Sequence, residues 1–266
     1  MSSSSTGGKS SSQYSTELAF ALTLADRADA ISLSRYQALD LEITTKPDNS
    51  PVTDADKAVE RAIIDAIATK YPSDGVVGEE FGTSGSKDRY WVIDPIDGTS
   101  NVVRGVPVWA SLIALVHDNV PVLGVVSAPA MRMRWWAHAS GDAFFNGTKI
   151  RVSDVGELRR ASLSITVNKY WHDVDPDGML ENLQRNVSRV RGYGDFWQHM
   201  LVAQGAVDIA IDSIGLAPYD IAALVPIVQQ AGGMCTDRLG EVNWRANSLV
   251  TSNSLLHAAT LAHLPK

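Results

Sequence analysis

Two carboxylates close an apolar run in the first half of the chain. Asp94-Pro95-Ile96-Asp97-Gly98-Thr99 follows directly on Tyr90-Trp91-Val92-Ile93, which predicts a strand that ends in acids. Two carboxylates this close repel each other unless a cation lies between them. The Gly-Thr-Ser continuation can open a helix, whose free N–H groups suit a phosphate. This combination is typical of a metal-dependent phosphate-ester hydrolase, although a capped turn is the alternative for the motif taken alone.

Further acids lie at the edges of other apolar elements. Glu79 and Glu80 follow Val76-Val77-Gly78, which predicts a second short strand. Pro51–Asp56 contains Thr53 and Asp54, either of which could cap the helix that follows. Asp220 lies just before an apolar-periodic helix that stops at Gly232-Gly233. Each acid alone could be a helix cap or a solvated charge, but together they favour a shared site.

These blocks resemble the inositol monophosphatase family of magnesium-dependent, lithium-sensitive phosphatases. The resemblance rests on the six-residue motif at 94–99, on Gly78-Glu79-Glu80 and on Tyr219-Asp220-Ile221-Ala222-Ala223, and it covers the chain from about Tyr14 onward. The stretches 101–112 and 191–196 are similar to one branch of that family. That branch acts as histidinol-phosphate phosphatase in actinobacterial histidine biosynthesis.

The resemblance implies a centre of two or three Mg²⁺ ions, with Mn²⁺ as a substitute. Glu79, Asp94 and the carbonyl of Ile96 would bind the first ion; Asp94, Asp97 and Asp220 would bind the second; a weaker third would lie on Glu79 and water. Mg²⁺ prefers hard oxygen ligands, and two such ions lie roughly 3.5–4 Å apart, which makes Asp94 the natural bridge. The six scattered histidines favour magnesium over zinc.

The catalytic residues implied by the resemblance are Asp56, Thr99 and Glu79, with Thr99 and Asp56 orienting and deprotonating the attacking water. Judged without the resemblance, Asp56 is an acid in the first turn of a helix, favourable to the helix dipole. The expected substrate-binding residues are Asp97, Gly98, Thr99, Ser100, Arg191 and Asp195. No covalent phosphoenzyme is needed.

Substrate choice is expected to depend on residues 191–195, where the family contacts the alcohol part of its substrate. Asp195 offers a carboxylate to a cationic amine, which histidinol phosphate carries and inositol phosphate lacks. Arg191 could clamp phosphate or form a surface ion pair. Lys46 matches a family lysine near the metals. Asp212 lies one residue out of register with an acid that grips the sugar in inositol enzymes.

Composition limits the function classes further. The chain has 266 residues, 45% hydrophobic and 20% charged, and a net charge of −7, which describes a globular protein that binds neither nucleic acid nor anionic membrane. A single cysteine, Cys235, excludes an internal disulfide framework and fits a cytoplasmic location. No apolar run reaches the roughly 18 residues that span a bilayer.

Periodicity divides the chain into a leader and one domain. Residues 1–12, nearly all Ser, Gly, Thr and Lys, are expected to be a disordered leader or tag. In the rest, 13–266, a half at about 13–155 has two helices and then antiparallel strands, and a half at about 156–266 alternates strands and helices. An α/β–α/β sandwich fits this pattern, with the site where the halves meet. The resemblance implies the same: an α/β (α+β) fold layered αβαβα, as a homodimer.

Several functions remain open at this stage. The leading one is hydrolysis of histidinol phosphate; inositol 1-phosphate, fructose 1,6-bisphosphate and nucleotide 3′-phosphate are alternatives within the superfamily. The acidic Asp195 argues mildly against the more anionic bisphosphates. A catalytically silent metal- or ligand-binding homologue belongs to another class. Two departures from the family pattern leave the metal ligands unchanged: Val102 for Phe bears on packing behind the motif, and Tyr219 for Trp bears on substrate detail.

Overall fold

Two sheets and the helices around them make up the computed structural model, which describes residues 13–46 and 50–266. Within these residues the large sheet has eight strands in the order β10-β9-β8-β7-β6-β5-β3-β4, and the small sheet has five in the order β12-β11-β13-β15-β14. A separate pair joins β1 (Ile43–Thr45) to β2 (Pro51–Thr53). The predicted leader, residues 1–12, lies outside the described residues.

The large sheet is antiparallel except where β3 pairs with β5. Side chains on β5 alternate between its two faces: Tyr90 and Val92 belong to one core cluster, Trp91 and Ile93 to another. The sheet is therefore apolar on both sides and must be covered on both. Its strands are β3 (Gly75–Gly78), β4 (Gly82–Ser84), β5 (Arg89–Asp97), β6 (Ala110–His117), β7 (Val120–Ala128), β8 (Met133–His138), β9 (Phe144–Phe145) and β10 (Thr148–Lys149).

Two long amphipathic helices, α1 (Ser15–Arg35) and α2 (Asp54–Lys70), cover one face of the large sheet. The sequence predicted two helices in this half of the chain. Thr53 is the N-cap of α2, and its N–H and hydroxyl both donate to the carboxylate of Asp56. This ties the start of α2 to a residue of the predicted site.

Three helices cover the other face of the large sheet: α6 (Asp195–Ala203), α7 (Pro218–Ile221) and α8 (Leu224–Gln230). The sequence predicted a single helix that begins just after Asp220 and stops at Gly232-Gly233, and that prediction was wrong because the structure has two helices here. Pro226 has no N–H to donate to the carbonyl of Ala222, so the helical hydrogen bonding is interrupted between α7 and α8. The short α7 contacts β5 of the large sheet.

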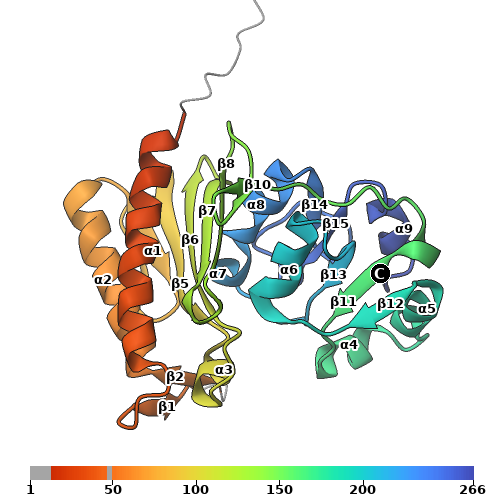
Figure 1. Ribbon diagram of the computed structural model, residues 1–266, viewed down its shortest axis with the longest axis horizontal. Coiled ribbons are helices and arrows are strands. Elements are labelled where there is room, and N and C mark those ends of the chain that lie inside the picture. The colour runs from red at the N-terminus through yellow and green to blue at the C-terminus, as the bar shows by residue number, and fades with distance from the viewer. Residues whose placement is uncertain (1–12, 47–49) are drawn as a thin grey trace, which may run out of the picture.

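The small sheet packs on the far side of these middle helices. Its strands are β11 (Ser162–Ile165), β12 (Arg189–Arg191), β13 (Ile209–Ile211), β14 (Gly233–Thr236) and β15 (Val250–Asn253). Its outer face is covered by α4 (Lys169–Val174), α5 (Met179–Asn186) and α9 (His257–Leu261), through a core that contains Leu163, Trp171 and Leu183. Figure 1 shows the resulting order of layers, helix–sheet–helix–sheet–helix, which confirms the predicted αβαβα sandwich.

Candidate active site

The acids of the predicted motif meet at the end of β5 that approaches the middle helices. The alternation that turns Tyr90 and Val92 toward those helices turns Asp94 the same way. The pairing with β6 then shifts register between Asp94 and Asp97, so that Asp97 also comes to this side. One ligand atom from each of Asp94, Asp97 and Asp220 lies within 4.8 Å of the others.

A cleft of about 270 Å³ opens over these acids. Most of the predicted site residues line it, and so do three residues that the sequence did not single out for the site, Ser50, Pro51 and Asn101. The predicted residues along its wall are Glu79, Asp94, Ile96, Asp97, Gly98, Thr99, Ser100, Asp195 and Asp220. The fold thus brings β3, β5, α3 (Thr99–Val103), α6 and α7 to one opening between the two halves.

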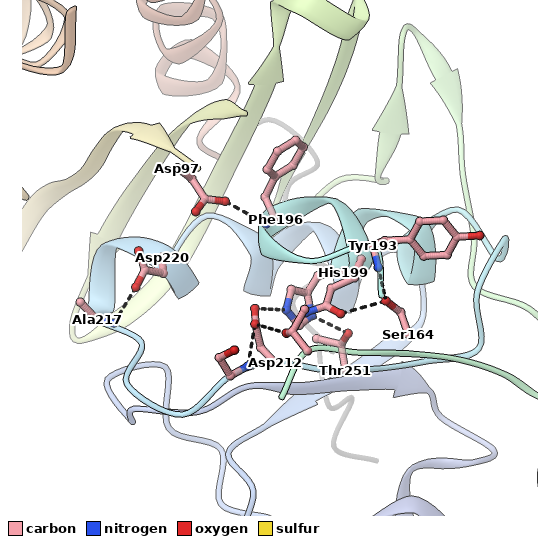
Figure 2. A network of polar contacts seen from close by, with 12 residues as sticks. Asp97, Ser164, Tyr193, Phe196, His199, Asp212, Ala217, Asp220 and Thr251 are labelled. Atoms are coloured by element: carbon pink, nitrogen blue, oxygen red, sulfur yellow. Dashed lines mark hydrogen bonds and ion pairs between the residues drawn. The ribbon is translucent and has the colours of Figure 1, made fainter. Parts of the chain in front are cut away.

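Each of two acids in the cluster has one oxygen occupied by the backbone of a neighbouring helix. The N–H of Phe196, in the first turn of α6, donates to Asp97 Oδ2 at 2.8 Å. The N–H of Ala217, the N-cap of α7, donates to Asp220 Oδ2 at 2.6 Å. Figure 2 shows both contacts. They fix the carboxylates in place and leave the second oxygen of each available to a ligand.

Electrostatics in the cluster are unfavourable to three ionised acids. Burial raises the pKa of Asp94 well above its usual range, and the charges of Glu79, Asp97 and Asp220 raise it further. Burial also raises the pKa of Asp220, to about 7, although the N–H of Ala217 opposes this. A cation placed among these oxygens would remove the repulsion.

The donor set suits a hard divalent cation. Asp94 Oδ1 and Glu79 Oε2 are buried and have no hydrogen-bond partner among residues 13–46 and 50–266. A buried carboxylate oxygen without a partner is costly unless something else binds it. Lys46 lies beside the cluster, with its Nζ 2.6 Å from Glu79 Oε1 and 2.5 Å from Glu80 Oε1. Its ammonium neutralises part of the charge but does not reach the two orphaned oxygens.

Thr99 and Asp56 are in contact, as expected for a pair that acts on water. Thr99 Oγ1 lies 3.0 Å from Asp56 Oδ1 and 2.9 Å from the carbonyl oxygen of Ile96. Asp56 is 1% exposed, and burial raises its pKa against the opposing hydrogen bonds of Thr53 and Thr99. The capping role and the contact with Thr99 therefore coexist: Oδ2 serves the helix start and Oδ1 serves the site.

Asp195 enters the cleft from the start of α6. Its backbone has φ 48°, in the left-handed region that Asp tolerates better than most residues, and it follows Gly194 at φ 75°. Its Oδ2 accepts a hydrogen bond of 3.0 Å from the amide of Asn101, which also donates to the carbonyl of Val108. Burial, with a contribution from the charge of Asp212, raises the pKa of Asp195 to about 6.

Two candidates from the sequence lie away from this cleft. Arg191 is exposed on β12, at the edge of the small sheet, and its guanidinium donates to the carbonyl of Val190. Asp212 is buried behind α6: His199 and Thr166 contact its carboxylate, and so does the N–H of Ser213. Figure 2 shows His199 between Asp212 and Thr251, well inside the small-sheet half. Asp212 Oδ2 contacts His199 of α6, and Oδ1 accepts from Thr166 and from the N–H of Ser213. Both oxygens are therefore occupied within the protein, which leaves Asp212 poorly placed to grip a substrate.

Sequence reasoning missed two polar residues that support the site. Asn101 immediately follows the motif, but nothing in its spacing pointed to Asp195, 94 residues away. Glu60 is completely buried and accepts the N–H groups of Glu80 and Phe81. Glu60 could have been noticed in the sequence, because it is an acid on the apolar face of the helix and lies four residues after Asp56. Of the two departures, Val102 packs against Trp109 and Ile96, and Tyr219 is half-buried beside the core.

Comparison with known proteins indicates one family. The family model described as the inositol monophosphatase family matches residues 13–266. A histidinol-phosphatase of Mycobacterium tuberculosis is 48% identical over 254 residues, covering 93% of this chain and 97% of the relative. A histidinol-phosphatase of Streptomyces coelicolor is 44% identical over 261 residues, covering 94% and 97%.

Solved structures give the same fold. The extragenic suppressor protein suhB of Bartonella henselae superposes with a TM-score of 0.88 at 26% identity, over 95% of this chain and 99% of that one. An IMPase of Thermotoga maritima superposes with a TM-score of 0.83 at 31% identity, over 93% and 96%. In this chain, no helix of the described ranges is long and apolar enough to cross a membrane.

Proposed function

This chain belongs to the inositol monophosphatase family, and on that premise we propose that it is a magnesium-dependent phosphatase that hydrolyses L-histidinol phosphate to L-histidinol and phosphate in histidine biosynthesis. The family is metal-dependent, and the cluster of Asp94, Asp97 and Asp220 is consistent with that chemistry. The single observation that carries the substrate is the carboxylate of Asp195 on the wall of the same cleft.

Five residues would hold the metal ions: Glu79, Asp94, the carbonyl of Ile96, Asp97 and Asp220. When bound, two or three Mg²⁺ ions, or Mn²⁺ in their place, supply positive charge for the phosphoryl oxygens and the departing alkoxide. The two orphaned oxygens, Asp94 Oδ1 and Glu79 Oε2, support this assignment because a cation would give both a partner. Oxygen donors without a histidine among them favour magnesium over zinc.

Thr99 and Asp56 would act on the attacking water, with Glu79 beside them. Thr99 Oγ1 lies within donating distance of Asp56 Oδ1 and can accept a hydrogen bond from water. As the water loses its proton to Thr99 Oγ1, the hydroxyl proton of Thr99 would pass to Asp56 Oδ1. Asp56 would be the final acceptor of the proton taken from water, and its raised pKa makes it a better base than an exposed aspartate. The N–H groups of Gly98 and Thr99, with Ser100 beside them, would hold the phosphate for in-line attack.

Asp195 would select the alcohol part of the substrate. Histidinol phosphate carries an ammonium group, and a half-buried carboxylate facing it makes a charge-assisted hydrogen bond. Asn101 occupies one oxygen of Asp195 and leaves the other for the ligand. The names of the two relatives at 44–48% identity support the same substrate. Arg191 and Asp212 have no role in this proposal, and Lys46 serves to balance charge at Glu79.

We also propose that the enzyme is a cytoplasmic homodimer. The family resemblance supports the dimer, and the single buried Cys235 suits a reducing compartment. Light scattering of the purified protein should give twice the mass of one chain. A monomer at micromolar concentration would contradict the dimer without affecting the assignment of the active site.

A substrate panel tests the proposal. Purified protein with Mg²⁺ is assayed for phosphate release from histidinol phosphate, inositol 1-phosphate and fructose 1,6-bisphosphate. The expected result is that kcat/KM is highest for histidinol phosphate and that no phosphate is released from any substrate without metal. Preference for inositol 1-phosphate would overturn the substrate and leave the metal chemistry, whereas no turnover of any ester would support a silent homologue.

A further inference from the structure

Helix α2 carries a second buried carboxylate, Glu60, one turn after Asp56. Glu60 is 0% exposed, and its side chain leaves the helix toward the segment that follows β3. Glu60 Oε2 accepts the N–H of Glu80 at 2.7 Å, and Oε1 accepts the N–H of Phe81 at 2.9 Å. Both oxygens of one carboxylate therefore bind consecutive backbone amides in a two-point clamp.

Gly78 makes room for this clamp. A Cβ added to Gly78 would lie 1.9 Å from Glu60 Oε1 and 2.6 Å from its carboxyl carbon, so any larger residue would displace the carboxylate. The glycine is needed here for close approach rather than for an unusual backbone angle. Because Gly78 has no side chain, the carboxylate of Glu60 can pass close to its Cα and reach the amides of Glu80 and Phe81.

The clamped segment carries Glu79, which lies between Gly78 and the first clamped amide. The side chains of Glu79 and Glu80 both form ion pairs with Lys46. A buried carboxylate is costly in a core that elsewhere holds Val59 and Ile63 on the same helix face, unless its hydrogen bonds compensate. The two amides supply those hydrogen bonds, and in return the backbone on which Glu79 sits is fixed.

We propose that Glu60 is a positioning residue for the metal centre: its carboxylate clamps the amides of Glu80 and Phe81 and so holds Glu79 in place for metal. This inference rests on the proposed role of Glu79 as a ligand. It also makes α2 a common support for the site, since Asp56 serves Thr99 and Glu60 serves Glu79 from adjacent turns of one helix. Residues that orient metal ligands typically change metal affinity 10- to 100-fold when mutated.

Glu60→Gln tests the proposal with little change in shape. A glutamine keeps one acceptor oxygen but turns an amide N–H₂ toward one of the two backbone N–H groups, so half of the clamp is lost. We expect Mn²⁺ and Mg²⁺ affinity, measured by calorimetric titration without substrate, to fall about 10- to 100-fold. Asp65→Asn, which removes an exposed carboxylate from the same helix, is the matched control and should leave affinity unchanged.

Gly78→Ala should produce the same loss by another route. If both variants act through the clamp, the double variant should lose little more than either alone, because the interaction is already broken. The amides of Glu80 and Phe81 should also exchange slowly with deuterium in the unaltered protein, a measurement that needs no variant to fold. Rapid exchange at both amides would overturn the clamp.

Glu79→Gln separates failure of this inference from failure of the proposed function. If Glu79→Gln weakens metal binding while Glu60→Gln lowers only the melting temperature, Glu60 is structural and the inference alone is overturned. If Glu79→Gln binds metal as the unaltered protein does, the ligand assignment fails and the inference falls with it. Loss of affinity in both variants, with secondary structure retained by circular dichroism, is the expected result.

Discussion

Asp94 is the residue on which the metal centre depends most. It is 2% exposed, one of its oxygens has no partner among the described residues, and the charges of Glu79, Asp97 and Asp220 all act on its carboxylate. Asp94→Asn keeps the shape but removes the charge, so we expect kcat to fall by roughly a thousandfold, about 4 kcal/mol. Phosphate release at saturating Mg²⁺ measures it, with circular dichroism as the check on folding. Turnover within a few-fold of the unaltered enzyme would remove Asp94 from the metal centre.

The Thr99–Asp56 pair should affect the chemical step rather than binding. Both residues would act on water in the transition state, so Thr99→Ala and Asp56→Asn should lower kcat far more than they raise KM. Steady-state kinetics on histidinol phosphate separates the two constants. Asp56→Asn will also weaken the start of α2, since Asp56 accepts two hydrogen bonds from Thr53. Thr99→Ala is therefore the cleaner variant, and a pure KM effect in it would contradict the role in water activation.

Asp195 should govern the choice between substrates. Replacing its charge by a neutral amide removes a charge-assisted hydrogen bond of roughly 1.5–3 kcal/mol, or about 10- to 150-fold in kcat/KM for histidinol phosphate. Inositol 1-phosphate has no ammonium group and should lose little. Asp195→Asn retains an oxygen for Asn101, so the loop is preserved. Asp177→Asn, at an exposed site, is the control, and equal losses on both substrates would show a general architectural role.

At the scale of elements, a buried polar contact anchors α6 to the small sheet. His199 on α6 lies 3.1 Å from Asp212 Oδ2 and 2.9 Å from Thr251 Oγ1, and Thr166 at the end of β11 donates to Asp212 Oδ1. Because α6 also carries Asp195 and donates to Asp97, this anchor positions one wall of the cleft. Helix α6 as a whole therefore links the small sheet to the site.

The anchor predicts a pH-dependent contribution to stability. Burial tends to raise the pKa of Asp212, but the hydrogen bond and charge of His199, with Thr166 and the N–H of Ser213, hold it below its ordinary 3.8. A lowered pKa in the folded state stabilises the protein above 3.8, and that stability is lost as pH falls through the folded-state value. Asp212→Asn should therefore cost about 1–3 kcal/mol at pH 7. The difference from the unaltered protein should shrink below about pH 3.8 in urea unfolding, whereas a constant difference would exclude ionisation as its cause.

At the scale of the whole molecule, the two halves meet across a concentration of negative charge. Glu79 and Asp94 come from the large-sheet half, and Asp195 and Asp220 come from the other. Their mutual repulsion opposes the packing of the two halves against each other unless a cation lies between the carboxylates. Metal should consequently hold the halves together as well as serve the chemistry.

Removal of metal should therefore destabilise the protein as well as inactivate it. At a Mg²⁺ concentration a hundred times its Kd, binding adds about 2.7 kcal/mol. In a chain of this length that corresponds to roughly 5–10 °C in melting temperature. Differential scanning fluorimetry in EDTA and in Mg²⁺ should show this difference, and phosphatase activity should return when Mg²⁺ is restored. Near-normal turnover in EDTA would rule out the metal mechanism.

Local patterns were sufficient to predict the main helices and strands, and the family resemblance added the layers and most of the residues along the cleft. The 3.6-residue period of α1 and α2, the apolar runs of β5 to β7 and the acids at their ends depend on nearest neighbours in the chain, which a sequence displays directly. The predicted acids Glu79, Asp94, Asp97, Asp195 and Asp220 all line one cleft, as their positions at element ends suggested. The break between α7 and α8 could also have been predicted from the sequence, because Pro226 cannot donate a helical hydrogen bond.

Contacts between distant segments were decided only by the tertiary structure. Asp212 and Arg191 carry the right chemistry but lie away from the cleft, whereas Asn101 and Glu60 reach residues 94 and 20 positions away. A side chain's type limits what it can bind, but its partner depends on which strands and helices the packed core brings together. Burial then sets the cost of each unpaired charge, and with it which carboxylates need a metal and which already have their hydrogen bonds.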